Sequence, residues 1–230
     1  MRYSLVAISL VLLLLGCQSA IDADLTRIGR QYYPMEVGLY RIYDVHDINY
    51  YLIDPVEEFY QLKEEIVDST ILSNGSIDYK LYRSKRTNAS ATWKLDSIWT
   101  TEVSTSRIVA DENNRSLVKM VFPIQNDSSW DANVYNNLAS EYYRYDTDRL
   151  DTTLFDQDYM EAVRIIQSDL GQITVGRDDR YEIYAPYIGL IVKSYIVWEY
   201  FQENGEIDPS KIVGGRELTQ TLIEYGKTKE

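Results

Sequence analysis

The chain has little of the side-chain chemistry on which most enzymes and metal proteins depend. Its 230 residues include one cysteine and one histidine. A single cysteine excludes an intrachain disulfide and a thiolate metal cluster, and a catalytic triad or zinc site would have to rest on His46 alone. We expect His46 to lie on a strand surface. The sequence thus offers no catalytic, metal-binding or cofactor-binding residue, and it predicts a non-enzymatic protein that needs no cofactor.

Long hydrophobic runs are also scarce, and the one present stands at the start of the chain. It extends from Leu5 to Gly16. As a helix it would be about 18 Å long, well short of the roughly 30 Å hydrocarbon core of a bilayer. Arg2 precedes the run and small residues end it, which is the layout of a secretory signal peptide over residues 1–16.

The end of this run carries a more specific pattern. Leu14, Leu15, Gly16 and Cys17 resemble the lipobox of bacterial lipoproteins, in which a small residue precedes a cysteine. The resemblance implies that Cys17 becomes the first residue of the mature chain and receives fatty acyl groups such as palmitate. Gln18 in place of Asp implies, by the same resemblance, an anchor in the outer membrane. The alternatives are an ordinary signal peptide that contains a cysteine, or a cysteine in a core strand.

Positive charge is in short supply. Lys and Arg number 23 against 36 Asp and Glu, for a net charge of −13. Such a surface repels phosphate backbones, so we expect no nucleic-acid partner. It also repels anionic lipid head groups, which leaves the N-terminal lipid as the expected membrane contact. The sequence does not name a protein or glycan partner.

Tyrosine is abundant, and it points to β structure. The chain has 21 Tyr against 4 Phe and 4 Trp, and Tyr suits the half-wet face of a sheet. Asn74-Gly75 between two alternating runs predicts a hairpin. We predict a lipidated tether over residues 17–30, followed by one antiparallel β domain over residues 31–230. The strands of this domain would form a curved sheet, a half-barrel or a sandwich.

Two later segments have weaker patterns and need their own assignment of secondary structure. In the segment from Tyr159 to Gly171, Val163, Ile165 and Gln167 alternate as in a strand, although a helix fits the pattern in part. We favour a strand. Residues 125–157 are polar and weakly periodic, and we expect loops with short strands there.

Three pairs of segments resemble one another in the same order along the chain. "YYPMEVGLYRIYDV" at Tyr32 resembles "VFPIQNDSSWDANV" at Val121, and segments that begin at Tyr60 and Tyr79 resemble later segments that begin at Tyr159 and Tyr181. Two readings fit: an internal duplication over residues 31–119 and 120–230, or the chance recurrence of Tyr-x-apolar-Tyr in strands.

The same segments are similar to motifs of uncharacterised lipoproteins from Bacteroidota-type bacteria. The motifs are "YYPMEVGLYRIYDV", "MVFPIQNDSSW" and "YEIYAPYIGLIVK". Those chains open with aromatic-Pro-apolar-x-x-Gly-x-aromatic and later carry a Tyr-x-Ala-x-x-Ile/Val-Gly-Leu corner. This chain has Asn126, Asp127 and Ser128 where a glycine is usual. The resemblance implies the fold and the anchor but lends no activity.

Two groups of residues suggest ligands without specifying them. Five aspartates (Asp146, Asp148, Asp151, Asp156 and Asp158) lie close together, but they lack the glycine and closing glutamate of a calcium-binding EF-hand loop. Trp93, Trp99 and Trp198 would stack on sugars if they shared an open face, although packing in the core or across strands is the simpler expectation.

We therefore expect a membrane-anchored binding or scaffolding domain of the bacterial envelope. The alternatives are an envelope glycan-binding accessory, or a half-barrel that handles lipids or lipoproteins.

Overall fold

The protein is one antiparallel β-sheet with no α-helix in the described residues, as the composition predicts. The computed structural model describes residues 28–154 and 157–228, with the backbone alone at residues 147–150. The predicted signal peptide, Cys17 and most of the predicted tether lie outside this range. A 3-10 turn at Arg30–Tyr32 precedes the strands.

Twelve strands follow one another along the chain. Their order in the sheet is β6-β5-β4-β3-β2-β1-β12-β11-β10-β9-β8-β7. Each strand therefore pairs with its neighbours in sequence, apart from β6 and β7, which form the two ends of the sheet. In addition, β1 pairs with β12. The strands are β1 (Leu39–Tyr50), β2 (Val56–Ile71), β3 (Ile77–Arg86), β4 (Lys94–Val103), β5 (Arg107–Glu112), β6 (Arg115–Val121), β7 (Ser129–Asp131), β8 (Tyr142–Leu154), β9 (Gln157–Ile173), β10 (Gly176–Ala185), β11 (Gly189–Glu203) and β12 (Glu206–Lys227).

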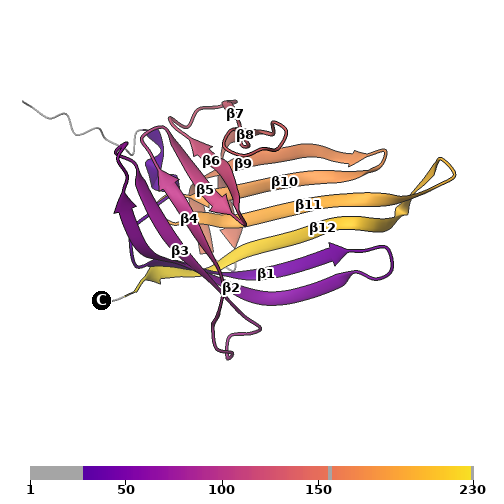
Figure 1. Cartoon of the computed structure of the whole chain (residues 1–230), viewed down its shortest axis with the longest axis horizontal. Helices are drawn as coiled ribbons and strands as arrows, with labels where there is room; N and C mark the ends of the chain where they lie inside the picture. Colours follow the sequence, from indigo (N-terminus) through magenta and orange to yellow (C-terminus); the bar gives the residue numbers. More distant parts are fainter. Residues whose placement is uncertain (1–27, 155–156, 229–230) are drawn as a thin grey trace, which may run out of the picture.

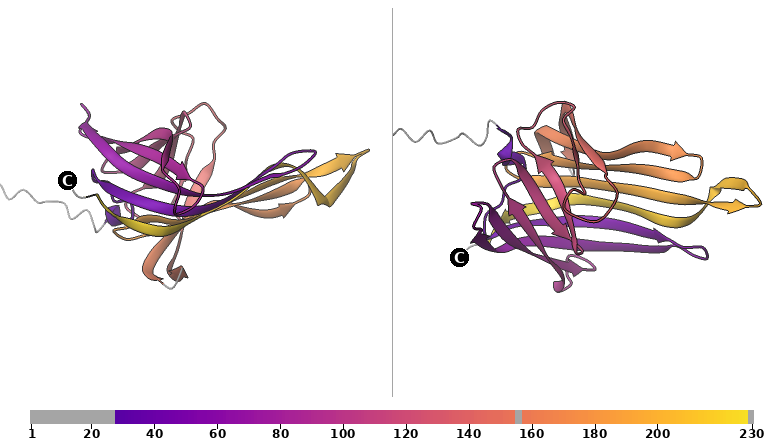
Figure 2. Two further views of the ribbon diagram at one scale, coloured as in Figure 1. Left: turned by 90° about the horizontal axis from the view of Figure 1, so that it is seen from below. Right: turned by 45° about the horizontal axis from the view of Figure 1, so that its top comes forward.

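The sheet is strongly curved. Strands β3 to β6 cross over the long strands β9 to β12, so that one sheet forms two facing layers (Figure 1). Beyond this overlap, β9 to β12 and the β1–β2 hairpin project as a single open layer (Figure 2). The interior of the protein therefore lies only at the overlapping end.

The two free edges of the sheet meet at a seam and nearly close it. The Val118 amide of β6 donates to the Ala132 carbonyl at 2.9 Å, just after β7. The Trp130 indole donates to the Val118 carbonyl at 2.8 Å, and the Val121 amide donates to the Tyr145 hydroxyl at 3.1 Å. Side chains thus satisfy backbone groups that an open edge would leave unpaired.

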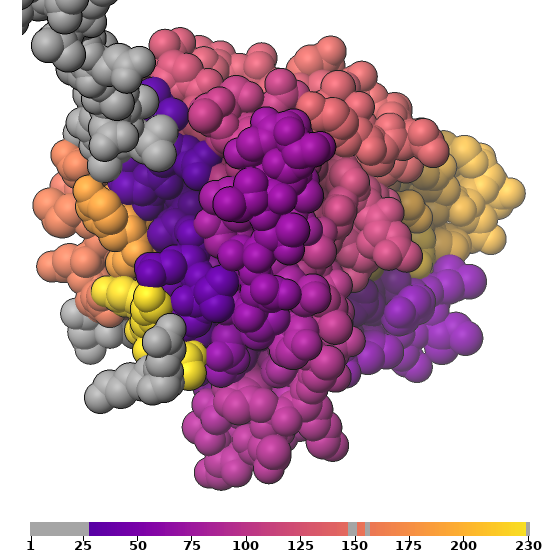
Figure 3. All heavy atoms as spheres, turned by 60° about the vertical axis from the view of Figure 1, so that its left-hand side comes forward, coloured from indigo at the N-terminus to yellow at the C-terminus, as the bar shows by residue number. Residues whose placement is uncertain are grey.

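The first described residues close one end of the curved sheet. Tyr32 is buried, and its hydroxyl donates to the Glu161 carbonyl at 2.8 Å. The Gln31 carbonyl accepts the Tyr187 amide at 2.7 Å. Figure 3 shows this indigo segment filling the space between the purple strands and the orange strands. The segment that leads from the expected anchor is thus part of the core, and the hairpins project from the opposite end.

The hairpin and strand predictions are confirmed. Asn74 and Gly75 form the turn between β2 and β3, where Gly75 has a φ of 82° that few other residues adopt without strain. The segment that alternates Val163, Ile165 and Gln167 is β9, and all three side chains are buried.

One local prediction is wrong. Residues 125–157 hold not only the short β7 but also β8, a strand of 13 residues. Among its side chains that the structure describes, Tyr143 and Tyr145 are buried, with Arg144 between them. Strand pairing with β9 and burial of tyrosine rings stabilise this segment, although it has few aliphatic residues.

The sheet order places β1 and β12 at its centre, with five further strands on each side of this pair. The internal duplication over residues 31–119 and 120–230 nevertheless stays a prediction, because strand order alone does not test whether the two halves share an origin.

Candidate ligand-binding cavity

A polar cavity of about 380 Å³ lies where the two layers of the sheet begin to separate. Both layers contribute side chains to it. Seven basic residues line it against three acidic ones, together with four aromatic residues, three amides and two leucines. The lining is Arg83, Lys85, Arg115, Lys119, Arg180, Lys193, Arg216, Asp96, Glu112, Glu141, Tyr60, Trp99, Tyr143, Tyr195, Asn113, Gln167, Gln220, Leu117 and Leu218.

The period of two in a β-strand determines which residues of β10 and β11 face the cavity side of the sheet. On β10, Arg180 and Glu182 lie two residues apart and therefore on one face of the sheet. On the neighbouring strand β11, Tyr195 pairs with Arg180 and Lys193 pairs with Glu182. Alternation and register thus place opposite charges side by side on the inner face.

The β5–β6 turn supplies residues from the other layer. Asn113 and Asn114 have φ angles of 53° and 61°. Positive φ at both central residues is the requirement of a tight two-residue hairpin, and asparagine tolerates it. The turn places Glu112 and Arg115 opposite each other across the hairpin.

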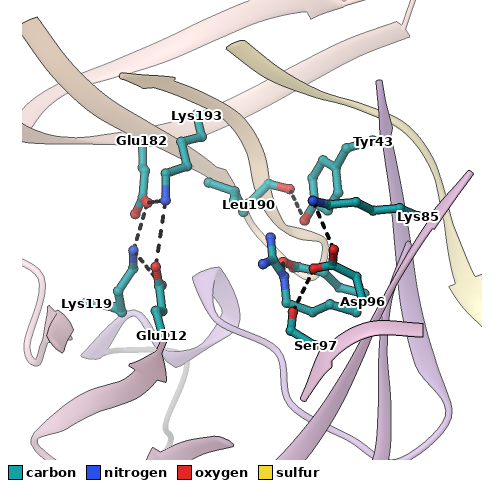
Figure 4. Close-up of polar contacts among 11 residues, drawn as sticks. Tyr43, Lys85, Asp96, Ser97, Glu112, Lys119, Glu182, Leu190 and Lys193 are labelled. Carbon is teal, nitrogen blue, oxygen red and sulfur yellow. Dashed lines mark hydrogen bonds and ion pairs between the residues drawn. The ribbon is translucent and has the colours of Figure 1, made fainter. Parts of the chain in front are cut away.

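A buried ion-pair network joins the two layers at the base of the cavity (Figure 4). The Lys119 ammonium of β6 lies 2.7 Å from Glu182 of β10 and 3.0 Å from Glu112 of β5. Lys193 of β11 lies 3.3 Å from Glu182. The Tyr184 hydroxyl donates to the second Glu182 oxygen at 2.7 Å. Every charge in this network therefore has an opposite charge beside it.

The network keeps its carboxylates ionised. Burial alone would raise the pKa of Glu182, but Lys119 and Lys193 lower it to about 2. The pKa of Glu112 is also lowered: burial opposes the shift, and Lys119 and Lys193 produce it. Burial would lower the pKa of Lys119, yet Glu112 and Glu182 raise it well above its ordinary value. Neither glutamate can hold a proton at neutral pH.

Two arginines of the cavity wall are each held by a carboxylate through two hydrogen bonds. Arg216 donates to both oxygens of the buried Asp47, at 2.7 and 2.6 Å. Arg180 donates to both oxygens of Asp178, at 2.6 and 2.9 Å, and also to Glu141. Bidentate pairing fixes the orientation of each guanidinium.

Most of the acidic partners stand behind the cations. Asp47, Asp178, Glu182 and Glu64 pair with lining cations but do not themselves line this cavity. Arg115 is exposed at the rim and has no ion pair within the described residues. The cavity is therefore faced by more positive than negative groups, in a chain whose net charge is −13.

Three side chains that line the cavity make no hydrogen bond within the described part of the chain. The side chains of Gln167 and Gln220 are 7% and 4% exposed, and neither amide makes a hydrogen bond. The Trp99 indole N–H is buried without an acceptor. The two glutamine amides are not among the fully buried unpaired atoms, so they reach solvent and can pair with a bound molecule or with water in the cavity.

A second, smaller cavity of about 50 Å³ continues toward the closed end. Arg41 lies there and donates to the Pro34 carbonyl at 2.9 Å. Gly189, with a φ of 96°, leaves room for this guanidinium, because a Cβ atom would lie 2.8 Å from the Arg41 Nε. A glycine is thus required by both backbone angle and close approach.

The other residues singled out from the sequence lie elsewhere. His46 is exposed on β1, stacked on Phe59 with ring centroids 4.3 Å apart and 2.7 Å from Glu57, so its placement on a strand surface is confirmed. Trp99 lines the cavity, whereas Trp93 and Trp198 do not. The three tryptophans therefore do not form one open face.

The aspartate cluster is dispersed among local contacts. Asp146 bonds Arg164 at 2.8 Å, and Asp158 accepts the Thr153 hydroxyl at 2.7 Å. Asp156 lies outside the described residues. Within the described ranges, no group of three or more His, Cys, Asp or Glu side chains is arranged to hold a metal ion.

Sequence reasoning missed the cavity residues other than Trp99. The available signal was charge at inward positions of predicted strands, such as Glu182 in "YEIY" and Gln167 in "VRIIQ". A lone charged or amide residue at an otherwise apolar strand position is weak evidence of a binding site. Only the fold brings these residues together.

The comparisons with known proteins add little to this picture. No family model matches the chain, and no curated protein matches it. One solved structure is similar, the crystal structure of a protein described as "a putative lipoprotein" from Parabacteroides distasonis ATCC 8503. It is 10% identical, with a TM-score of 0.39, over 85% of this chain and 98% of that one. In the described part of the chain, no helix is long and apolar enough to cross a bilayer.

Proposed function

We propose that this protein is a lipid-anchored binding protein of the bacterial envelope that captures a small polar molecule in its cavity. The observation that carries the proposal is the cavity of about 380 Å³, whose wall includes two glutamine amides that have no hydrogen-bond partner in the described residues. Small-molecule sites have volumes of roughly 300–1,000 Å³ and a few convergent polar groups.

Binding accounts for these residues better than catalysis does. A general acid needs a pKa near the working pH, whereas the pKa values of Glu112 and Glu182 are lowered by neighbouring lysines. The chain's one histidine, His46, lies outside this cavity. The groups at the wall are suited to hold a ligand in place.

The lining also favours one of the two alternatives named above. An acyl chain placed against a charged, hydrogen-bonding wall would cost free energy, because the polar groups would lose water and gain no partner. A hydroxyl-rich ligand would satisfy them. We therefore favour an envelope glycan or a related polar solute over a lipid as the ligand.

The anchor is tested at Cys17. Two or three acyl chains hold a protein durably at a membrane, since each buried methylene contributes about 0.8 kcal/mol. We expect the Cys17→Ala variant to leave the membrane fraction, and mass spectrometry of the wild-type protein to find acyl groups on the N-terminal cysteine. A Ser19→Ala variant, two residues later, serves as a matched control and should stay with membranes. A Cys17→Ala protein that fractionates like the wild type would contradict the anchor.

The binding proposal is tested by thermal shift. Detergent-extracted protein would be screened with neutral and acidic monosaccharides at millimolar concentration. Any ligand that raises the unfolding temperature should lose this effect in Gln220→Leu, because that substitution removes an amide from the cavity wall. If no sugar raises the unfolding temperature, the cavity is a water-filled structural feature and the proposal is wrong.

A further inference from the structure

Basic side chains outnumber acidic ones at the cavity wall, the reverse of their proportion in the whole chain. Acidic residues outnumber basic ones in the chain by 36 to 23, but seven basic and three acidic side chains line the cavity. Six of the seven cations already pair with carboxylates. Arg115 is the lining cation that has no ion pair in the described residues, and an anionic ligand would supply the partner that it lacks.

The cations are held in fixed positions before any ligand arrives. Asp47 clamps Arg216 through two hydrogen bonds, and Asp178 clamps Arg180 in the same way. The Arg83 guanidinium lies 3.5 Å from the centre of the Trp99 ring, with its Nε 3.0 Å from Glu64. Side chains that are already ordered lose little entropy on binding.

The unsatisfied hydrogen-bonding groups at the wall are mainly donors. Arg115 contributes a guanidinium without an acidic partner in the described residues. Gln167 and Gln220 each add an amide that can both donate and accept. The lining carboxylates already accept bonds from cations. The ligand must therefore present several acceptor oxygens, and some hydroxyl groups for the amide oxygens.

The volume sets the size of the ligand. About 380 Å³ corresponds to roughly a dozen water molecules at about 30 Å³ each. A monosaccharide acid fits this space, whereas a folded peptide segment or a lipid tail does not fit a short, charged cavity.

Building on the proposed binding function, we propose that the cavity binds a small hydroxyl-rich carboxylate of the sugar-acid class. The carboxylate lies toward Arg115 and Lys193, and the hydroxyl groups meet the amides of Gln167 and Gln220.

Isothermal titration calorimetry of the detergent-extracted protein tests this assignment. The probes are D-galacturonate, D-glucuronate and N-acetylneuraminate, each compared with neutral D-galactose and with inorganic sulfate. We expect at least one sugar acid to bind roughly tenfold more tightly than D-galactose and than sulfate, because a charge-assisted hydrogen bond contributes about that factor. Binding should weaken as salt rises.

Two variants locate the binding. Arg115→Gln removes a rim cation that has no ion pair in the described residues, so it should fold normally and weaken the sugar acid about tenfold. Arg144→Gln removes the same charge from an exposed pair with Asp169 outside the cavity and should leave the affinity within about twofold.

The outcomes separate the two proposals. If D-galactose binds as tightly as the sugar acids and Arg115→Gln changes nothing, the protein binds sugars but the assignment of an anion is wrong. If sulfate binds as tightly as the sugar acids, the site holds a simple anion and the hydroxyl contacts are wrong. If none of the probes binds, both this inference and the binding function are overturned.

Discussion

The two ends of the sheet's interior are built on the same strands but hold different side chains. At the closed end, β9 presents Val163 and Ile165, and β10 presents Tyr184, all within an apolar cluster. Two to four residues further along, the same inner face presents Gln167 on β9 and Arg180 on β10. One end is filled with hydrocarbon and aromatic rings, and the other is hollow and charged.

The two ends of the interior contribute differently to stability and to function. Burial of apolar surface contributes about 25 cal/mol per Å² and needs no ligand, so the closed end can hold the fold by itself. The charged end gains less, because desolvation of ions offsets much of their attraction. Its residues are therefore better explained by what they bind than by what they stabilise. Glu182, at the boundary, belongs to both regions because it contacts Tyr184 on one side and two lysines on the other.

The largest expected effect comes from breaking the boundary network. Lys119→Met leaves Glu112 and Glu182 buried with only Lys193 to compensate them. Removal of one member of a buried ion pair costs about 3–5 kcal/mol, which urea unfolding would measure. The matched control is Lys227→Met, whose partner Glu36 is exposed, and it should cost less than about 1 kcal/mol. Equal costs for the two variants would show that the interior network does not join the layers.

A smaller effect is expected from acid. The pKa of Glu182 is lowered from 4.5 to about 2 in the folded state by Lys119 and Lys193, against burial. A carboxyl with a lowered pKa binds fewer protons when folded than when unfolded, so its contribution to stability is present above about pH 5 and is lost as the pH falls toward 2.

The denaturant midpoint, measured from pH 7 to pH 2, should therefore fall over this interval. Glu182→Gln should flatten that fall, and the exposed Glu36→Gln should not. A Glu182→Gln profile parallel to that of the wild type would place the acid-sensitive group elsewhere.

The smallest effect on stability is expected at the hollow end. Gln167→Leu replaces a buried amide that has no protein partner by an apolar group of similar size, so the free energy of unfolding should stay within about 1 kcal/mol or rise. Asn133→Leu is the contrast. That buried amide donates to the Ala139 carbonyl at 2.7 Å, and its loss should cost about 1–3 kcal/mol. If Gln167→Leu costs as much as Asn133→Leu, Gln167 has a structural role and the functional reading of the hollow end weakens.

The sequence predicted the strands wherever apolar residues alternate clearly. Val163, Ile165 and Gln167 lie on one face of β9 because a strand has a period of two, and this period is visible in the residues themselves. The same rule failed at β8, where the buried residues among the described side chains are Tyr143 and Tyr145, in a largely polar segment. Tyrosine occurs at both wet and buried positions, so its burial depends on which strand pairs beside it.

By itself, the sequence determined the β class, the turn at Asn74-Gly75 and the prediction of lipidation at Cys17, because these depend on local backbone preference and short motifs. Only the tertiary structure decided which inward residues face a filled core and which face a cavity. Lys119 and Glu182 lie 63 positions apart in the chain but 2.7 Å apart in space. Their meeting depends on the curvature of the whole sheet, and no local pattern encodes the distance between two layers.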